Sequence, residues 1–159
     1  MLIAIYLAAI VAANLSVTYF GVASTIVNAF LFIGLDITTR DKLHEKWRGK
    51  GLWWKMAALI AIGSALSFTL NREAGPVALA SLIAFGASGA VDTAVYHLLR
   101  KMDTQTRVNG SNIVSAAVDS ILFPTIAFGS LMPGVVLGQF IAKVVGGYIW
   151  FRIIKKTEV

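Results

Sequence analysis

Cysteine is absent from this chain of 159 residues, which excludes disulfide bonds, thiolate metal ligands and a cysteine nucleophile. Histidine occurs only twice, and the eight acidic residues show no metal-ligand spacing. A glycine-rich P-loop is missing as well, so any use of ATP would have to come from a partner. These absences argue against an enzyme and against a metal or other cofactor.

Charged residues are scarce too, at 14% of the chain against 57% hydrophobic residues. A soluble domain has roughly a quarter charged residues, and six spans of about 20 residues would use nearly the whole chain. The first apolar run has neither a basic start nor a small-residue cleavage site, so we expect a retained helix rather than a signal peptide. The sequence therefore predicts an all-α, polytopic membrane protein, with six transmembrane helices in one bundle and a single integral membrane domain over residues 1–159.

The helices are expected at about 2–18, 22–39, 52–70, 77–99, 112–132 and 135–151. Of the 14 basic residues, twelve follow the second, fourth or sixth apolar run, one (Arg72) lies in a loop of opposite parity, and one (Lys143) lies inside a helix. This positive-inside bias predicts a multi-pass protein of the cell (inner) membrane with both termini cytoplasmic. It also accounts for the net charge of +6 without a nucleic-acid partner.

Three ionisable residues, Asp92, Asp119 and Lys143, fall inside apolar helices. Each lies roughly 10–13 Å from the cytoplasmic end of its helix at the usual helical rise, so all three share one layer of the bilayer. An ionisable group at the centre of a membrane helix costs roughly 2.5–3.5 kcal/mol and is normally paired, buried and functional. We therefore expect these residues to approach one another around a cavity for a transported substrate. The alternative is an ion-pair network that only holds the helices together.

Other polar and aromatic residues accompany these charges. Asn28 and Gln139 are expected to line the same cavity, although Asn28, like Asn14, also fits hydrogen bonding between helices. Pro124 cannot donate to the carbonyl of Ser120, which places a free acceptor next to Asp119. The remaining candidates for substrate contact are Asn112, Tyr96 and Phe123, and the two aromatics fit either stacking on a ligand or ordinary packing.

Asp36 and Arg40 are spaced i,i+4 near the expected cytoplasmic end of the second helix. That spacing lets a carboxylate and a guanidinium pair on one helix face. We expect a boundary salt bridge or a gate latch here.

Longer segments around several of these residues resemble a known family. They are Asn14-Leu15, the stretch from Phe32 to Arg40, the stretch from Gly110 to Ser120, and Gln139 to Lys143. Together they resemble the queuosine-precursor transporter family, also called the putative vitamin uptake transporter family. The resemblance implies a six-helix fold and import of 7-cyano-7-deazaguanine or a related deazapurine.

The residues suit such a ligand. A deazaguanine presents N1–H beside an exocyclic amine, and the two oxygens of one carboxylate match these two donors. Asp119 is favoured for this contact, and Asp92 as the partner of Lys143. Gln139, Asn28 or Asn112 would donate to the ring carbonyl, and Phe123 or Tyr96 would stack on the ring.

A second function stands beside this one. Ala4, Ala8 and Ala12 form a stripe of small residues on the first helix, of the kind that packs membrane helices together. The stripe also resembles the docking face of the substrate-binding subunits of energy-coupling-factor importers, which need a separate ATPase complex. The expected partners are thus the deazapurine and the lipid bilayer, with a homodimer left open and no nucleic acid.

Overall fold

The computed structural model describes residues 1–47 and 51–156, and within these ranges the chain is helical and has no strand. The long helices are α1 (Leu2–Phe20), α3 (Gly34–Trp47), α4 (Leu52–Leu70), α5 (Gly75–Leu98), α6 (Thr104–Phe128) and α7 (Pro133–Lys156). The short elements are η1 (Gly21–Ser24), α2 (Thr25–Asn28), the π-helical segment η2 (Ala29–Ile33) and η3 (Arg72–Ala74). Since η1, α2, η2 and α3 follow one another without a gap, residues 21–47 form one continuous helical rod.

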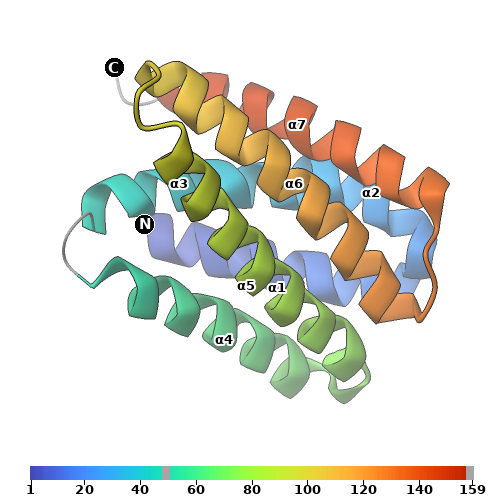
Figure 1. Cartoon of the computed structure of the whole chain (residues 1–159). Coiled ribbons are helices and arrows are strands. Elements are labelled where there is room, and N and C mark those ends of the chain that lie inside the picture. The colour runs from blue at the N-terminus through green and yellow to red at the C-terminus, as the bar shows by residue number, and fades with distance from the viewer. Residues whose placement is uncertain (48–50, 157–159) are drawn as a thin grey trace.

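Among the described residues, three helical stretches are long and apolar enough to cross a membrane: Leu2–Arg40, Arg72–Leu98 and Thr106–Phe128. A shorter apolar helix covers Trp54–Leu70. The first stretch has 39 residues, and the chain reverses direction within it between α1 and α2 (Figure 1). Gly21 has a φ of 64°, a left-handed conformation that glycine adopts without steric cost.

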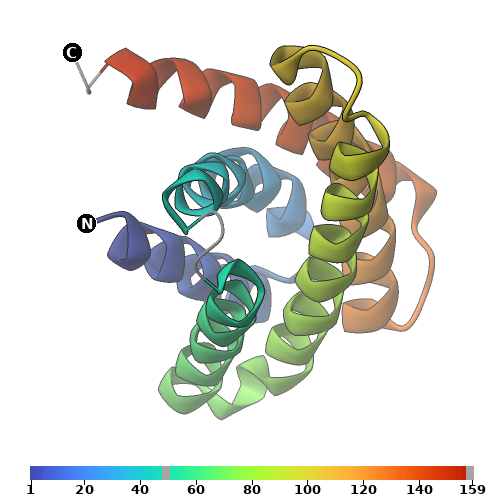
Figure 2. The same ribbon diagram turned by 60° about the vertical axis from the view of Figure 1, so that its left-hand side comes forward.

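Each long helix packs mainly against two others, in the order α1, α4, α5, α6, α7, α3 and back to α1. In Figure 2, α3 lies between α1 and α7. An apolar cluster that includes Tyr6, Leu43, Met56 and Phe85 joins α1, α3, α4 and α5. The C-terminal ends of α3, α5 and α7 lie at the same end of the molecule as the N-terminus (Figure 1), so the segments richest in basic residues gather there.

The second and fifth helices differ most from the sequence prediction. The second was expected to end at about residue 39, but α3 continues to Trp47, because Leu43 is buried in the apolar cluster and holds this turn against α1 and α4. The fifth was expected at about 112–132, but α6 spans Thr104–Phe128. Asp103 caps its start by accepting a hydrogen bond from the N–H of Thr106 at 3.0 Å, and Gly129, with a φ of 69°, ends it.

The other helices agree more closely with the prediction. α4 has the expected bounds, α1 and α5 differ by one or two residues at an end, and α7 begins at Pro133 and continues to Lys156. The basic residues Arg48 and Lys50 lie outside the described residues.

Glycine allows α7 to approach η2 and α3 closely. Gly146 lies against the backbone of Phe30 and Gly34, and a Cβ atom at position 146 would be only 2.5 Å from the carbonyl oxygen of Phe30. One turn further, the hydroxyl of Thr38 donates to the carbonyl of Gly147 at 3.3 Å. This close packing carries the polar residues of α7 toward the centre of the molecule.

Candidate functional site

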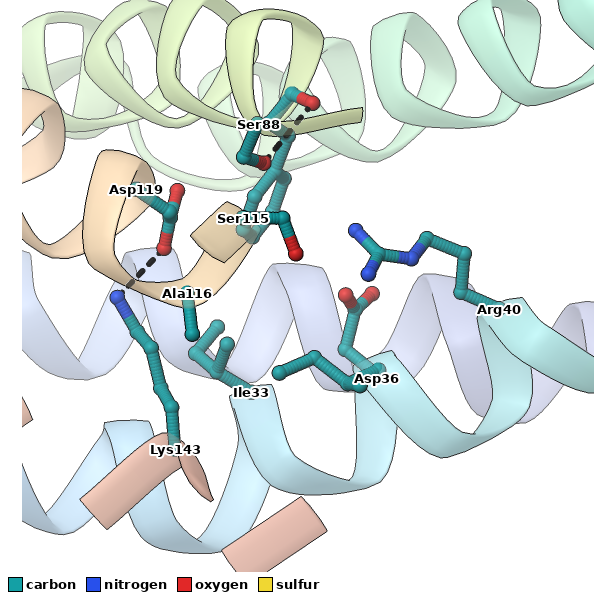
Figure 3. A pocket seen from close by; sticks show the side chains of 10 residues that line it. Ile33, Asp36, Arg40, Ser88, Ser115, Ala116, Asp119 and Lys143 are labelled. Carbon is teal, nitrogen blue, oxygen red and sulfur yellow. Dashed lines mark hydrogen bonds and ion pairs between the residues drawn. The ribbon is translucent and has the colours of Figure 1, made fainter. Parts of the chain in front are cut away.

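Lys143 of α7 is the centre of the buried polar site. Its side chain is 2% exposed, and its ammonium nitrogen Nζ donates to three acceptors. These are Asp119 Oδ2 at 2.5 Å, Ser120 Oγ at 3.1 Å and Gln139 Oε1 at 3.2 Å. Asp119 and Ser120 come from α6, whereas Gln139 lies one turn before Lys143 on α7, so the ammonium ties the two helices together (Figure 3).

Two small cavities meet at this ion pair. The first, here named the Asn28 cavity, has the polar side chains of Asn14, Asn28, Ser81 and Gln139 and the ring of Phe123 among its walls. The second, the Arg40 cavity, has Asp36, Arg40, Ser88 and Ser115 among its walls. Asp119, Lys143, Ile33 and Phe85 line both cavities, so these four side chains form the partition between them.

The two cavities lie at different depths along the molecule. Asn28 and Arg40 are twelve residues apart on one continuous helical rod, which is roughly 18 Å at the helical rise. Each cavity has open space for only about one water molecule. A fused two-ring ligand therefore requires the surrounding helices or side chains to move apart.

Two polar atoms of the site are buried without a hydrogen-bond partner among the described residues. They are Asp119 Oδ1, an acceptor, and Gln139 Nε2, a donor. Both residues line the Asn28 cavity, and both are at least nine-tenths buried. A buried polar atom without a partner costs about 1–3 kcal/mol, so these two atoms mark a place where a bound molecule would stabilise the protein.

Asp36 and Arg40 are both buried, at 2% and 7% exposed. They are one turn apart on α3, and Figure 3 shows the carboxylate and the guanidinium pointing toward one another beside the Arg40 cavity. The sequence placed them at the end of a helix, but α3 continues seven residues past Arg40 to Trp47. They therefore belong to the wall of a cavity inside the helix packing.

The two asparagines line the Asn28 cavity and also connect helices. Asn14 Nδ2 donates to Ser67 Oγ at 3.1 Å, and Asn14 Oδ1 accepts from Ser81 Oγ at 2.5 Å, which links α1 to α4 and α5. Asn28 Nδ2 donates to the carbonyl of Ala13 and to Ser24 Oγ, both at 3.4 Å. The link through Ser67 was not foreseen, although a serine in a mostly apolar helix was a visible signal.

Other candidates lie outside both cavities. Asp92 is buried on α5 but lines neither cavity, and Lys143 pairs with Asp119 rather than with Asp92, which corrects the expected pairing. Tyr96 packs under the guanidinium of Arg107, 4.7 Å from the ring centre. Asn112 also lines neither cavity. Of the two aromatics, only Phe123 lines a cavity. Its ring also packs edge-to-face against the ring of Phe128, with 6.5 Å between the two ring centres.

The expected bidentate contact stays a prediction. Asp119 was expected to offer both carboxylate oxygens to two ligand donors; here Oδ2 accepts from Lys143, and Oδ1 has no hydrogen-bond partner among the described residues. A carboxylate oxygen has two lone pairs, so Oδ2 can accept a second hydrogen bond. Depth along a helix predicted that these residues share a layer, but it could not predict which face of each helix they occupy.

Apolar helices long enough to cross a membrane, packed around a buried acid–base pair with polar cavities on both sides, define an integral membrane protein with a polar centre. Residues 3–154 match the family model described as putative vitamin uptake transporter, and the chain belongs to this transporter family. This confirms the family resemblance found in the sequence. Comparisons with curated proteins and with solved structures give no match.

Proposed function

We propose that this protein imports a queuosine precursor, 7-cyano-7-deazaguanine or a related deazapurine, across the inner membrane. In this proposal residues 1–159 form one domain of six membrane-spanning helices, with both termini and the basic end of the molecule in the cytoplasm. Family membership supports transport of a small organic molecule rather than catalysis. The segments that resemble the queuosine-precursor transporters support the deazapurine.

The observation that carries the proposal is the position of the Asp119–Lys143 pair between two polar cavities. A purely structural ion pair needs no cavity, and costly ionisable residues inside a membrane protein usually mark a path for ions or polar molecules. The Asn28 cavity lies toward the end of the molecule opposite the basic end, and the Arg40 cavity lies toward the basic end. The partition of Asp119, Lys143, Ile33 and Phe85 is then the barrier that opens during transport.

A flat heterocycle suits the Asn28 cavity. The ring of Phe123 offers an apolar face for stacking, and Asp119 Oδ1 and Gln139 Nε2 offer an acceptor and a donor for the polar edge. In the Arg40 cavity, Asp36 and Arg40 act as a second barrier on the cytoplasmic side. With room for about one water molecule in each cavity, the structure corresponds to a closed carrier.

Uptake by the purified chain in liposomes tests the proposal. We expect saturable uptake of radiolabelled 7-cyano-7-deazaguanine, and comparison with and without a pH gradient separates proton-coupled from facilitated transport. Asp119→Asn should reduce uptake at low substrate by about 30-fold, because a charge-assisted contact is lost. Glu73→Gln, a change in an exposed turn, is the matched control. Absence of uptake and of binding for every deazapurine would contradict the function.

The alternative function is a substrate-binding subunit of an energy-coupling-factor-type importer. Ala4 and Ala8 are exposed on α1, so part of the small-residue stripe is open to a partner helix. In that case the chain alone would bind the deazapurine but would not carry it into liposomes. Ala8→Leu would then block uptake in cells without changing binding by the purified chain, whereas in a carrier that acts alone it would change neither.

A further inference from the structure

We propose that Asp92 of α5 is a proton-binding site. Its carboxyl group holds a proton while the carrier is closed and releases that proton when water reaches it. The proposed function gives Asp92 no role, because the residue lines neither cavity. This inference rests on the proposed function only in taking the structure as the closed form of a carrier.

The first step is a comparison of the buried charges. Among the described residues, the buried charged side chains are Asp36, Asp92, Asp119, Arg40 and Lys143. Lys143 is bonded to Asp119, and the guanidinium of Arg40 points toward Asp36 (Figure 3). Three carboxylates thus face two cations, and Asp92 is the carboxylate left over within the described part of the chain.

The second step concerns the immediate surroundings of Asp92. The residue is 6% exposed, and its Oδ1 atom is buried without a hydrogen-bond partner among the described residues. An isolated buried carboxylate is very costly, and a carboxyl group in such a place takes up a proton instead of carrying the charge. With a proton on Asp92, two carboxylates remain to balance the two buried cations.

The third step is that the helices around α5 do not supply the missing cation. α5 packs against α6, α4, α1 and η3. On these elements the described cations are Arg107, Lys55 and Arg72, and the other titratable or acidic side chains are Asp103, Asp119, Tyr6, Tyr19 and Glu73.

Each of these cations has another place. Arg107 lies over the ring of Tyr96, 4.7 Å from the ring centre. Lys55 lies over two tryptophan rings, and Arg72 is at the opposite end of α5. Within the described residues, none of them forms an ion pair with Asp92.

The fourth step connects Asp92 to the transport path. Asp92 follows Ser88 by one helical turn and lies on the same face of α5. Ser88 is buried in the wall of the Arg40 cavity. Opening of that cavity brings water close to Asp92, and water stabilises an ionised carboxylate. The proton therefore leaves in the open form and returns when the helices close around Asp92.

The direction of the pH effect follows from this difference between the two forms. The closed form binds one more proton than the open form, so a rise in pH favours the open form. Substrate crosses the membrane only by way of the closed form. Exchange of substrate across the membrane thus becomes slower as the pH rises.

Infrared spectroscopy of the purified protein in detergent tests the proton directly and needs no substrate. Exposed carboxyl groups are ionised at neutral pH, so the carbonyl stretching band of a protonated carboxyl group reports a buried one. We expect this band in the wild-type protein and in Glu73→Gln, a change in an exposed turn, and its loss in Asp92→Asn. Absence of the band from the wild-type protein, or its persistence in Asp92→Asn, would overturn the inference.

Exchange of radiolabelled 7-cyano-7-deazaguanine in liposomes, with the same pH on both sides, tests the role of the proton. We expect the wild-type rate to fall as the pH is raised, by up to about tenfold per pH unit once most carriers have lost the proton. Asp92→Asn should remove this dependence, and Asp92→Glu, which restores a carboxyl group, should retain it. Titration of the substrate itself affects every variant alike, so the comparison between variants cancels it.

Each other outcome of the exchange experiment is decisive. A wild-type rate that does not vary with pH, or an Asp92→Asn profile that matches the wild-type profile, would overturn the inference and leave a deazapurine carrier intact. A requirement for sodium ions in place of the pH dependence would assign Asp92 to a metal cation and would also overturn it. If no deazapurine is bound or exchanged, the proposed function fails, and the infrared band still decides whether Asp92 holds a proton.

Discussion

Lys143 keeps the buried centre between α6 and α7 electrically neutral. Replacement by methionine leaves the Asp119 carboxylate buried without its cation, and removal of one partner from a buried ion pair costs about 3–5 kcal/mol. We therefore expect Lys143→Met to lower the unfolding temperature of the protein in detergent. Replacement of both charges, by Asp119→Asn and Lys143→Met together, should restore most of the loss. Equal losses in the single and double variants would show that the unpaired charge is not the cause.

Two aromatic residues that the sequence could not separate differ in their surroundings. Phe123 lines the Asn28 cavity, whereas Tyr96 packs under Arg107 outside both cavities. Stacking of an aromatic side chain on a heterocycle contributes about 1–3 kcal/mol. We expect Phe123→Leu to weaken deazapurine binding by about 5- to 150-fold and Tyr96→Leu to leave it within about twofold. Titration calorimetry on both variants measures the difference, and a larger loss in the Tyr96 variant would contradict the site.

At the level of the helices, glycine in α7 has a testable role. Gly146→Ala places a methyl group 2.5 Å from the carbonyl oxygen of Phe30, and backbone atoms within packed helices cannot yield as a flexible side chain does. We expect this change to destabilise the protein by about 1–3 kcal/mol, the usual cost of overpacking.

Gly86→Ala is the matched comparison within another helix. Gly86 lies in α5 with no atom within 4 Å of an added Cβ, so alanine should stabilise the helix by about 0.5–1 kcal/mol. Thermal unfolding in detergent compares the two variants. Stabilisation by both changes would mean that α7 and η2 are not held in close contact.

Hydropathy predicted where the helices lie, but it did not predict the bounds of helices that extend into charged or polar sequence. The bounds of α4 follow from its apolar run, whereas α3 continues through charged residues because Leu43 packs into the core. The start of α6 had a readable signal in the capping pair of Asp103 and Thr106, which the apolar pattern outweighed. The rod from Gly21 to Trp47 contains a π turn, and no local pattern predicted it.

The site was predictable in composition and not in pairing. Asp119, Lys143, Asn28 and Gln139 share one cavity, and each was selected because a polar residue in an apolar helix needs a partner. Asp92 was placed with them because it lies at the same depth and on a polar stripe of its helix that includes Ser81 and Ser88. Because the rotation of α5 about its axis is set by packing across the whole molecule, depth could not show that Asp92 lies outside both cavities.

At the scale of the whole molecule, the absence of cysteine makes topology directly measurable. We expect Arg72→Cys and Leu131→Cys to react with a membrane-impermeant thiol reagent in intact cells. Lys46→Cys and Met102→Cys, near the basic end, should react only after the membrane is permeabilised. All four positions are exposed in the structure, and the unsubstituted chain gives the background. Labelling of position 46 or 102 from outside would overturn the orientation.

The π turn at Ala29–Ile33 has a consequence for how the Arg40 cavity is encoded. A π turn holds one more residue than an α-helical turn, and each residue of a helix adds about 100° of rotation. If Ala29–Ile33 became ordinary α-helix with every residue kept, the rod after it would turn by about that angle, because the π turn accommodates the additional residue. Asp36 and Arg40 would keep their identities and leave the cavity wall. The direction in which Asp36 and Arg40 face about the helix axis is therefore set by the π turn that precedes them.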